Sequence, residues 1–109
     1  MNNEDLLSRE FLISAFGALK KTKKQYKTYI LLDNASKLYK IGRATNVEKR
    51  LSSLIVANPS LSIILVIDAN VENRLHKEYA SNRVKSEWFK LSEDDIRSIN
   101  DKYNNEVYE

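Results

Sequence analysis

The chain has 109 residues, no cysteine, two glycines and one proline, with a formal net charge of +3 at pH 7. This length fits one domain with a single modest core. The absence of cysteine excludes disulfides and thiolate zinc sites, and two glycines leave no room for a glycine-rich phosphate loop.

The charge is unevenly spread along the chain. Residues 20–50 contain ten Lys or Arg and two acidic residues, which gives this segment a net charge of +8. A basic segment favours binding to nucleic acid because phosphate neutralisation supplies most non-specific affinity, although a solvated lysine-rich connector explains the same charges.

The longest apolar run, Ile63–Ile67, is far shorter than the roughly 20 residues of a membrane span. The N-terminus lacks the basic start of a secretory signal, so we expect a cytoplasmic protein without membrane contact.

The first predicted element is an amphipathic helix from about Glu4 to Leu19, where apolar residues recur at spacings of three and four. The basic run Lys20–Lys24 follows as a connector or arm. Tyr26–Asp33 and Leu38–Gly42 are rich in strand-forming residues and flank a turn of Asp, Asn and Ser. These two segments predict a β-hairpin.

A second helix is predicted after the hairpin, capped by Thr45 or Asn46 and running to about Val56. The continuous apolar run Leu61–Ile67 then predicts a buried central strand.

A third helix is predicted to about Ala80, with Asp68 or Asn70 as its cap. Ser86–Leu91 contains Trp88 and Phe89 and predicts a short strand or an ordered loop.

The last predicted helix begins near Ser92, where Asp95 resembles the partner in a capping box, and runs to about Tyr103. This order of elements predicts an α+β fold: a three-stranded, mostly antiparallel sheet flanked by helices, plus the N-terminal helix. Residues 1–25 would form that helix and its basic connector, and residues 26–109 the domain.

Four residues could build a site for phosphodiester cleavage. Lys40 follows Tyr29 by eleven residues, Arg50 follows Lys40 by ten, and Glu72 opens the third helix. Cleavage needs a base for the attacking water, positive charge for the phosphorane and help for the leaving oxygen. Tyr29 and Lys40 could meet across one face of the hairpin, and the planar fork of arginine suits phosphate.

Each of these residues also has a purely structural explanation. A strand tyrosine is usually packing, Lys40 and Arg50 are ordinary surface charges, and a carboxylate such as Glu72 is favoured in the first turn of any helix. His76, the only histidine, follows Glu72 by four residues and shares its helix face. It could lie near a metal, relay a proton or contact DNA, or it could be a half-buried polar residue.

Further basic residues would contact a nucleic acid. Lys24, Lys27, Arg43 and Lys49 are candidates for phosphate contacts rather than for reading bases. Trp88 and Phe89 could stack on a base, but packing in the core explains them better.

Four ordered segments resemble the GIY-YIG nuclease superfamily, and more closely its compact branch in phages, large DNA viruses and microbes. They are Lys27–Leu31 (KTYIL), Tyr39–Leu51 with its YKIG sequence, Glu72–Tyr79 (ENRLHKEY) and Ser86–Leu91 with its EWF sequence. The resemblance covers about residues 26–91.

The resemblance implies a role for each of the four residues. Tyr29 would be the general base or would position the water, and Arg50 would contact the scissile phosphate. Glu72 would bind one divalent metal ion, Mg²⁺ or Mn²⁺. Lys40 stands where many members have a second tyrosine, and some restriction enzymes of the superfamily are similar in having lysine there. Lys27 replaces the first glycine of the family pattern, and the late family asparagine has no clear counterpart.

The resemblance implies a metal-dependent endonuclease that hydrolyses double- or single-stranded DNA. One alternative is a non-catalytic nucleic-acid-binding module that kept the fold. Another is an interaction factor that binds a second copy or a partner protein through the N-terminal helix. Assays of cleavage, DNA binding and partner binding, on the whole chain and on a chain without residues 1–19, separate these three hypotheses.

Overall fold

The computed structural model describes residues 24–105. The helix predicted over Glu4–Leu19 and the start of its connector lie outside the described residues. The elements in chain order are β2 (Lys27–Asp33), β3 (Leu38–Ala44), α2 (Val47–Ala57), β4 (Leu61–Ile67), α3 (Glu72–Glu78), η1 (Ala80–Asn82), β5 (Arg83–Lys85), β6 (Trp88–Phe89), α4 (Glu93–Asn100) and η2 (Asp101–Asn105). Within this part of the chain, no helix is long and apolar enough to cross a membrane.

The described strands form one antiparallel sheet in the order β4-β2-β3-β6-β5. The predicted hairpin is confirmed as β2 and β3, and a strand at Leu61–Ile67 is confirmed as β4. Its predicted place as a buried central strand is wrong, because β4 lies at the edge of the sheet, next to β2, and its side chains Ile63 and Val66 are exposed. The prediction of three strands is wrong, because β6 adds to the far side of β3 and β5 adds to β6. These two strands have two and three residues, too few for a recognisable alternation, and they form because Tyr39 and Lys40 offer pairing partners to Phe89 and Trp88.

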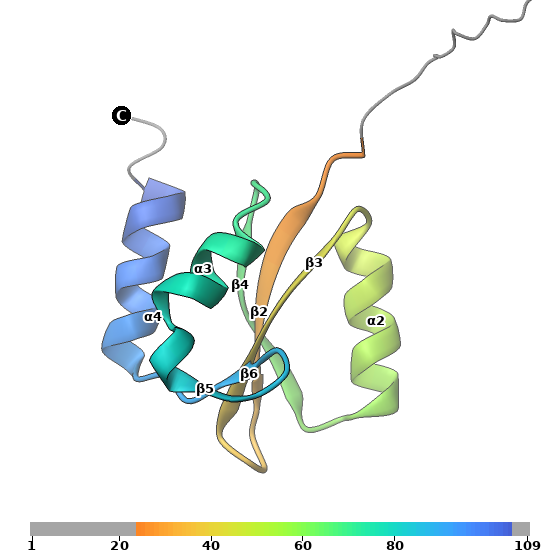
Figure 1. The fold of residues 1–109 in the computed structure, drawn as a ribbon. Coiled ribbons are helices and arrows are strands. Elements are labelled where there is room, and N and C mark those ends of the chain that lie inside the picture. The colour runs from red at the N-terminus through yellow and green to blue at the C-terminus, as the bar shows by residue number, and fades with distance from the viewer. Residues whose placement is uncertain (1–23, 106–109) are drawn as a thin grey trace, which may run out of the picture.

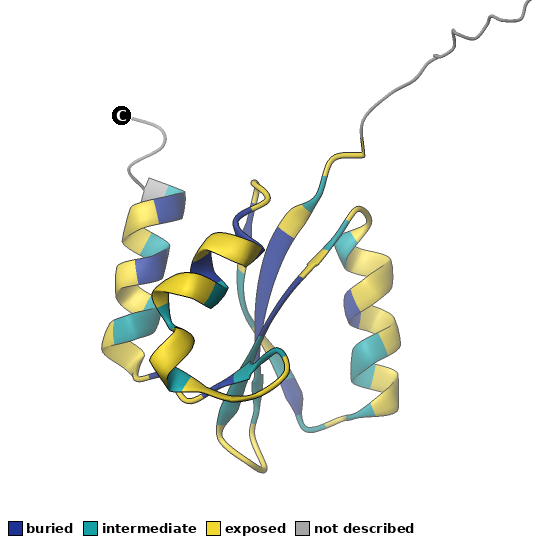
Figure 2. Cartoon of the chain, viewed as in Figure 1, coloured by how far each residue is buried: buried dark blue, intermediate teal, exposed yellow. Residues whose placement is uncertain are grey.

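The sheet separates two hydrophobic clusters. Helix α2 packs on one face, where Leu51 joins Tyr29 and Leu31 of β2. Helices α3 and α4 cover the opposite face (Figure 1), and their residues Leu75 and Ile99 pack there with core side chains of the sheet. Figure 2 shows the buried residues in the strands and on the sheet-facing sides of the helices, as amphipathic helices require.

Side-chain caps explain where two helices begin. The Asn46 side chain accepts a hydrogen bond from the Lys49 backbone N–H, which confirms Asn46 as the cap of α2. Ser92 and Asp95 form the expected reciprocal capping box at the start of α4. The last helix was expected to continue to about Tyr103, but α4 ends at Asn100 and the chain continues as the π-helical turn η2.

The predicted cap of α3 is wrong. Neither Asp68 nor Asn70 caps this helix; the N-cap position is Val71, whose side chain makes no capping hydrogen bond. The Val71 N–H instead donates to the Thr28 hydroxyl, 2.9 Å away, on strand β2. A tertiary contact therefore replaces the local cap.

Candidate active site

Two helices leave the sheet at the same end. The last residue of β3, Ala44, pairs with Lys27 at the start of β2, and the last residue of β4, Ile67, pairs with Thr28. Helix α2 follows β3 and α3 follows β4, so both begin at this end of the sheet, on opposite faces (Figure 1). Their first turns carry Arg50 and Glu72, two of the predicted site residues.

Thr28 fixes the start of α3 to the sheet. Its fully buried hydroxyl donates to the Ala69 carbonyl at 2.8 Å and accepts from the Val71 N–H at 2.9 Å. Glu72 follows Val71 directly, so these two hydrogen bonds set the position of its backbone. Thr28 was not predicted as a site residue, since a strand threonine gives no sign of a partner 43 positions away.

Replacing Thr28 with valine is expected to destabilise the fold by about 1–3 kcal/mol. The change nearly conserves volume but leaves the buried Val71 N–H and the part-buried Ala69 carbonyl without their partner. Urea unfolding measures the loss, and the exposed Thr45→Val is the matched control, expected within about 0.5 kcal/mol of the wild type. Equal stability of the two variants would contradict the assigned role of Thr28.

Glu72 is nearly buried, with its side chain 11% exposed. Its Oε1 lies 3.4 Å from Nε of Arg43, and its Oε2 lies 3.9 Å from Nε2 of His76. The structure thus brings Arg43 and His76, both singled out in the sequence, beside the carboxylate of Glu72. A carboxylate this far from water needs such partners, because burying an unpaired charge is costly.

The hydrogen bonds of His76 fix its tautomer. A guanidinium only donates, so Nδ1 of His76 must accept from the Arg83 NH2 group 3.0 Å away. Nε2 therefore carries the proton and donates to the Ile41 carbonyl at 3.0 Å. The imidazole also packs on Phe89, with ring centroids 4.9 Å apart. Both ring nitrogens are engaged, so His76 lies beside Glu72 but links α3 to the sheet and offers no lone pair to a metal.

Tyr29 lies flat against the backbone of the neighbouring strand. It pairs with Gly42, and a Cβ placed on Gly42 would be 2.5 Å from the Tyr29 hydroxyl oxygen and 2.6 Å from the adjoining ring carbon. Any larger residue at position 42 would displace the ring. The glycine of the YKIG sequence therefore serves the position of the tyrosine, a packing role that the sequence alone did not reveal.

Lys40 lies on the same face of the hairpin as Tyr29, because Lys40 and Gly42 are two residues apart on β3. Its ammonium donates to Oε1 of Glu87 at 2.8 Å and lies 5.5 Å from the centroid of the Trp88 ring. Trp88 packs with the cluster under α2, and Phe89 is fully buried on the other face. We expected both aromatic side chains to pack in the core rather than stack on a base. Full burial confirms this for Phe89, and the half-buried Trp88 is consistent with it.

A basic pocket lies beside the start of α2. It has a volume of about 390 Å³ and is lined by Tyr26, Ala44, Thr45, Asn46, Lys49, Arg50 and Ser53. Arg50 and Lys49 are exposed there, available to a ligand. The guanidinium of Arg43 stacks on the Tyr26 ring, 4.5 Å from its centroid, and so connects this pocket with Glu72. Tyr26 was predicted only as a strand residue.

The sheet itself keeps some of the predicted residues apart. Tyr29 packs with the α2 cluster, whereas Glu72 belongs to α3 on the opposite face, and they share only the end of the sheet. Lys24 is exposed ahead of β2, and Lys27 forms an exposed ion pair with Asp68 at 3.7 Å. Neither of these two lysines forms an ion pair with Glu72.

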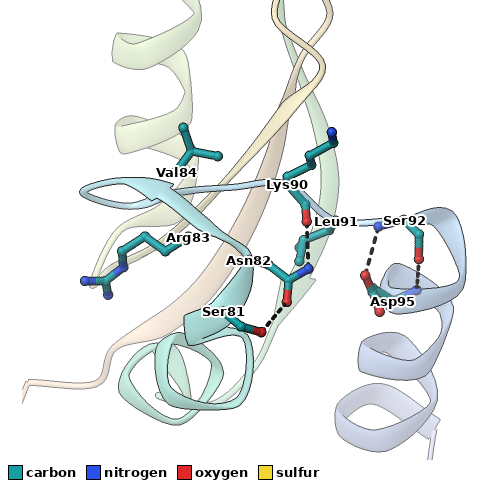
Figure 3. Close-up of a pocket in the computed structure, with 8 residues that line it drawn as sticks. All are labelled: Ser81, Asn82, Arg83, Val84, Lys90, Leu91, Ser92 and Asp95. Atoms are coloured by element: carbon teal, nitrogen blue, oxygen red, sulfur yellow. Dashed lines mark hydrogen bonds between the residues drawn. The ribbon is translucent and has the colours of Figure 1, made fainter.

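Another cavity, of about 460 Å³, lies between η1 and the start of α4 (Figure 3). Its polar groups already bond to one another: the Asn82 side chain donates to the Lys90 carbonyl, and Ser92 pairs with Asp95. Figure 3 shows these bonds within the cavity wall. We therefore interpret the polar groups of this cavity as stabilising the fold, and we do not include the cavity in the candidate site.

Glu72 offers one carboxylate, which suits only a hard divalent cation that takes its other ligands from water and substrate. Among the described residues, no group of three or more His, Cys, Asp or Glu side chains could hold a metal ion. An enclosed all-protein cage is therefore absent from this part of the chain. A single carboxylate completed by waters and substrate phosphate is an ordinary arrangement for Mg²⁺, and Glu72 can supply that carboxylate.

The family model of the T5orf172 domain matches residues 23–104, which is most of the chain. Comparison with curated protein sequences and with solved structures gives no match. The matched range contains the whole described sheet and helices α2, α3 and α4, together with Tyr29, Lys40, Arg50 and Glu72. The chain therefore belongs to the T5orf172 domain family, which is related to the GIY-YIG domains.

Proposed function

We propose that this chain is a metal-dependent endonuclease that hydrolyses phosphodiester bonds of DNA. The observation that carries the proposal is the common origin of α2 and α3 at one end of the sheet, which gives a nearly buried carboxylate and an exposed arginine the same neighbourhood. Arg43 on Tyr26 connects the two. Membership of a GIY-YIG-related family supports the same conclusion.

Each residue has a defined task in the proposed reaction. Arg50, with Lys49 beside it, holds the scissile phosphate, since two exposed cations in one pocket suit an anion. Tyr29 orients the attacking water and takes its proton, and the absence of a Cβ at Gly42 leaves the space that its ring occupies. Lys40 adds positive charge on the same face. Glu72 would hold Mg²⁺ or Mn²⁺, which stabilises negative charge on the phosphate oxygens.

The cleavage assay uses supercoiled plasmid and single-stranded DNA with Mg²⁺, Mn²⁺ or a chelator. Arg50→Gln is expected to lower the cleavage rate by about 10²–10³-fold, because it removes the charge that meets the developing phosphorane. Arg97→Gln is the matched control: this exposed arginine of α4 does not line the pocket, and its replacement should leave the rate unchanged. Equal rates for both variants would contradict the role of Arg50.

One observation favours a second function, a DNA-binding module without turnover. Glu72 already has Arg43 as an ion-pair partner, so its carboxylate could serve only to hold α3 on the sheet. In that case the wild type would bind DNA with a steep salt dependence and cut neither substrate with any metal. Cutting that the chelator stops would exclude this function.

A further inference from the structure

The carboxylate of Glu72 has one ion-pair partner of fixed positive charge in the described part of the chain, Arg43. The other partner, His76, is neutral in the tautomer that its bonds to Ile41 and Arg83 require. Arg43 therefore supplies the charge that makes a nearly buried carboxylate tolerable in the metal-free protein.

The contact between Arg43 and Glu72 is loose. At 3.4 Å, the Nε–Oε1 distance exceeds the 2.7–2.9 Å typical of a charge-assisted hydrogen bond. The arginine side chain is 40% exposed, whereas the glutamate is 11% exposed. A half-exposed cation with a long contact can leave, but the carboxylate stays where the backbone of α3 places it.

Arg43 also has a second anchor. Its guanidinium stacks on Tyr26 at 4.5 Å, and Tyr26 lines the pocket that contains Lys49 and Arg50. A guanidinium that slides along the tyrosine ring moves from Glu72 toward this pocket and keeps most of its cation–π contact. The stack thus favours one direction of release.

We propose that Arg43 is a resident counter-ion that a divalent metal displaces from Glu72, and that the displaced guanidinium then binds a phosphate of the DNA. The inference rests on the proposed function, because it takes Glu72 as the metal ligand. Two cations compete for one carboxylate, so Arg43 weakens metal binding in the absence of DNA. Metal binding in turn frees Arg43 for phosphate, so metal and DNA each strengthen binding of the other, as linkage demands.

The test is a calorimetric titration of the DNA-free protein with Mn²⁺. Arg43→Gln is expected to bind Mn²⁺ about three- to tenfold more tightly than the wild type, since the competing cation is gone. Arg74→Gln, an exposed arginine on α3, is the control and should bind as the wild type does. Glu72→Gln should lose the binding. Short-duplex affinity measured in the same buffers should rise with Mn²⁺ in the wild type and rise less in Arg43→Gln.

The outcomes separate this inference from the proposed function. Equal Mn²⁺ affinity of wild type and Arg43→Gln, with binding lost in Glu72→Gln, overturns the counter-ion role and leaves the nuclease proposal standing. Absence of Mn²⁺ binding in all variants overturns the inference, and absence of Mn²⁺ binding also in the presence of the short duplex overturns both. A readout on the wild type covers the case in which Arg43→Gln does not fold: saturating Mg²⁺ should shift the Arg43 Nε–Hε resonance and leave that of Arg97 unchanged, and an unshifted Arg43 overturns the inference.

Discussion

Replacing Glu72 with glutamine is expected to reduce metal-dependent DNA cleavage by at least about 10³-fold. The amide keeps the size of the side chain but removes the negative charge that would hold a divalent cation. Stability should change little, because the partner left behind, Arg43, is 40% exposed and retains its stack on Tyr26. The measurement is the rate of plasmid nicking at saturating Mg²⁺, with thermal unfolding as the check of folding.

The matched control for this change is Glu78→Gln on the same helix. Glu78 is exposed and pairs with Lys102, and an exposed ion pair contributes about 0–1 kcal/mol to stability and nothing to the site. The control should cleave at the wild-type rate. If Glu72→Gln cleaves as fast as Glu78→Gln, the carboxylate has no part in the reaction, and the metal site must be sought elsewhere.

Replacing Tyr29 with phenylalanine is expected to lower the cleavage rate by about 10²–10⁴-fold, the usual contribution of a general base. The ring, which packs with Leu31 and Leu51 and against Gly42, stays in place, so the fold is preserved. The variant should still bind DNA with wild-type affinity, because the phosphate-binding cations are untouched. Single-turnover cleavage and duplex binding measured together separate the chemical step from binding.

Tyr39→Phe is the control for the loss of a hydroxyl. Tyr39 belongs to the neighbouring strand β3 and packs with the cluster on the opposite face of the sheet, away from Gly42. Its replacement should leave both the rate and the affinity unchanged. A Tyr29→Phe variant that is as active as Tyr39→Phe would exclude the Tyr29 hydroxyl as the base. Lys40, which lies on the same face as Tyr29, would then be the next candidate for the base.

Local patterns in the sequence predicted the hairpin, a strand at Leu61–Ile67 and the helices that flank them, but not that this strand lies at the edge of the sheet. Strand-forming residues bounded by a turn are enough to predict β2 and β3, and the cap at Asn46 follows from a side chain that bonds its own helix. These features depend on residues within a few positions of one another, so a short stretch of sequence is enough to predict them. The strands β5 and β6 are too short to show a local pattern, and they form because β6 pairs with β3 and β5 pairs with β6.

In the candidate site, too, the sequence predicted some features and only the packing of the chain revealed others. Residue types and spacing singled out Tyr29, Arg50 and Glu72, which all lie within the range that the family model matches. Neither spacing nor composition could show that Gly42 makes room for the Tyr29 ring, or that Glu87 pairs with Lys40 from 47 positions away. Such contacts arise only when separate segments pack together.

The sequence by itself determined the class of fold and the order of the main elements, and it singled out the candidate residues of the site, because each depends on local propensity or on side-chain type. The tertiary structure alone decided the partners of those residues. Thr28 replaces the expected cap of α3, and Arg43 meets Glu72 across 29 positions of the chain. The physical reason is that burial and long-range pairing assign each polar group its partner, and neither is encoded in the spacing of neighbours.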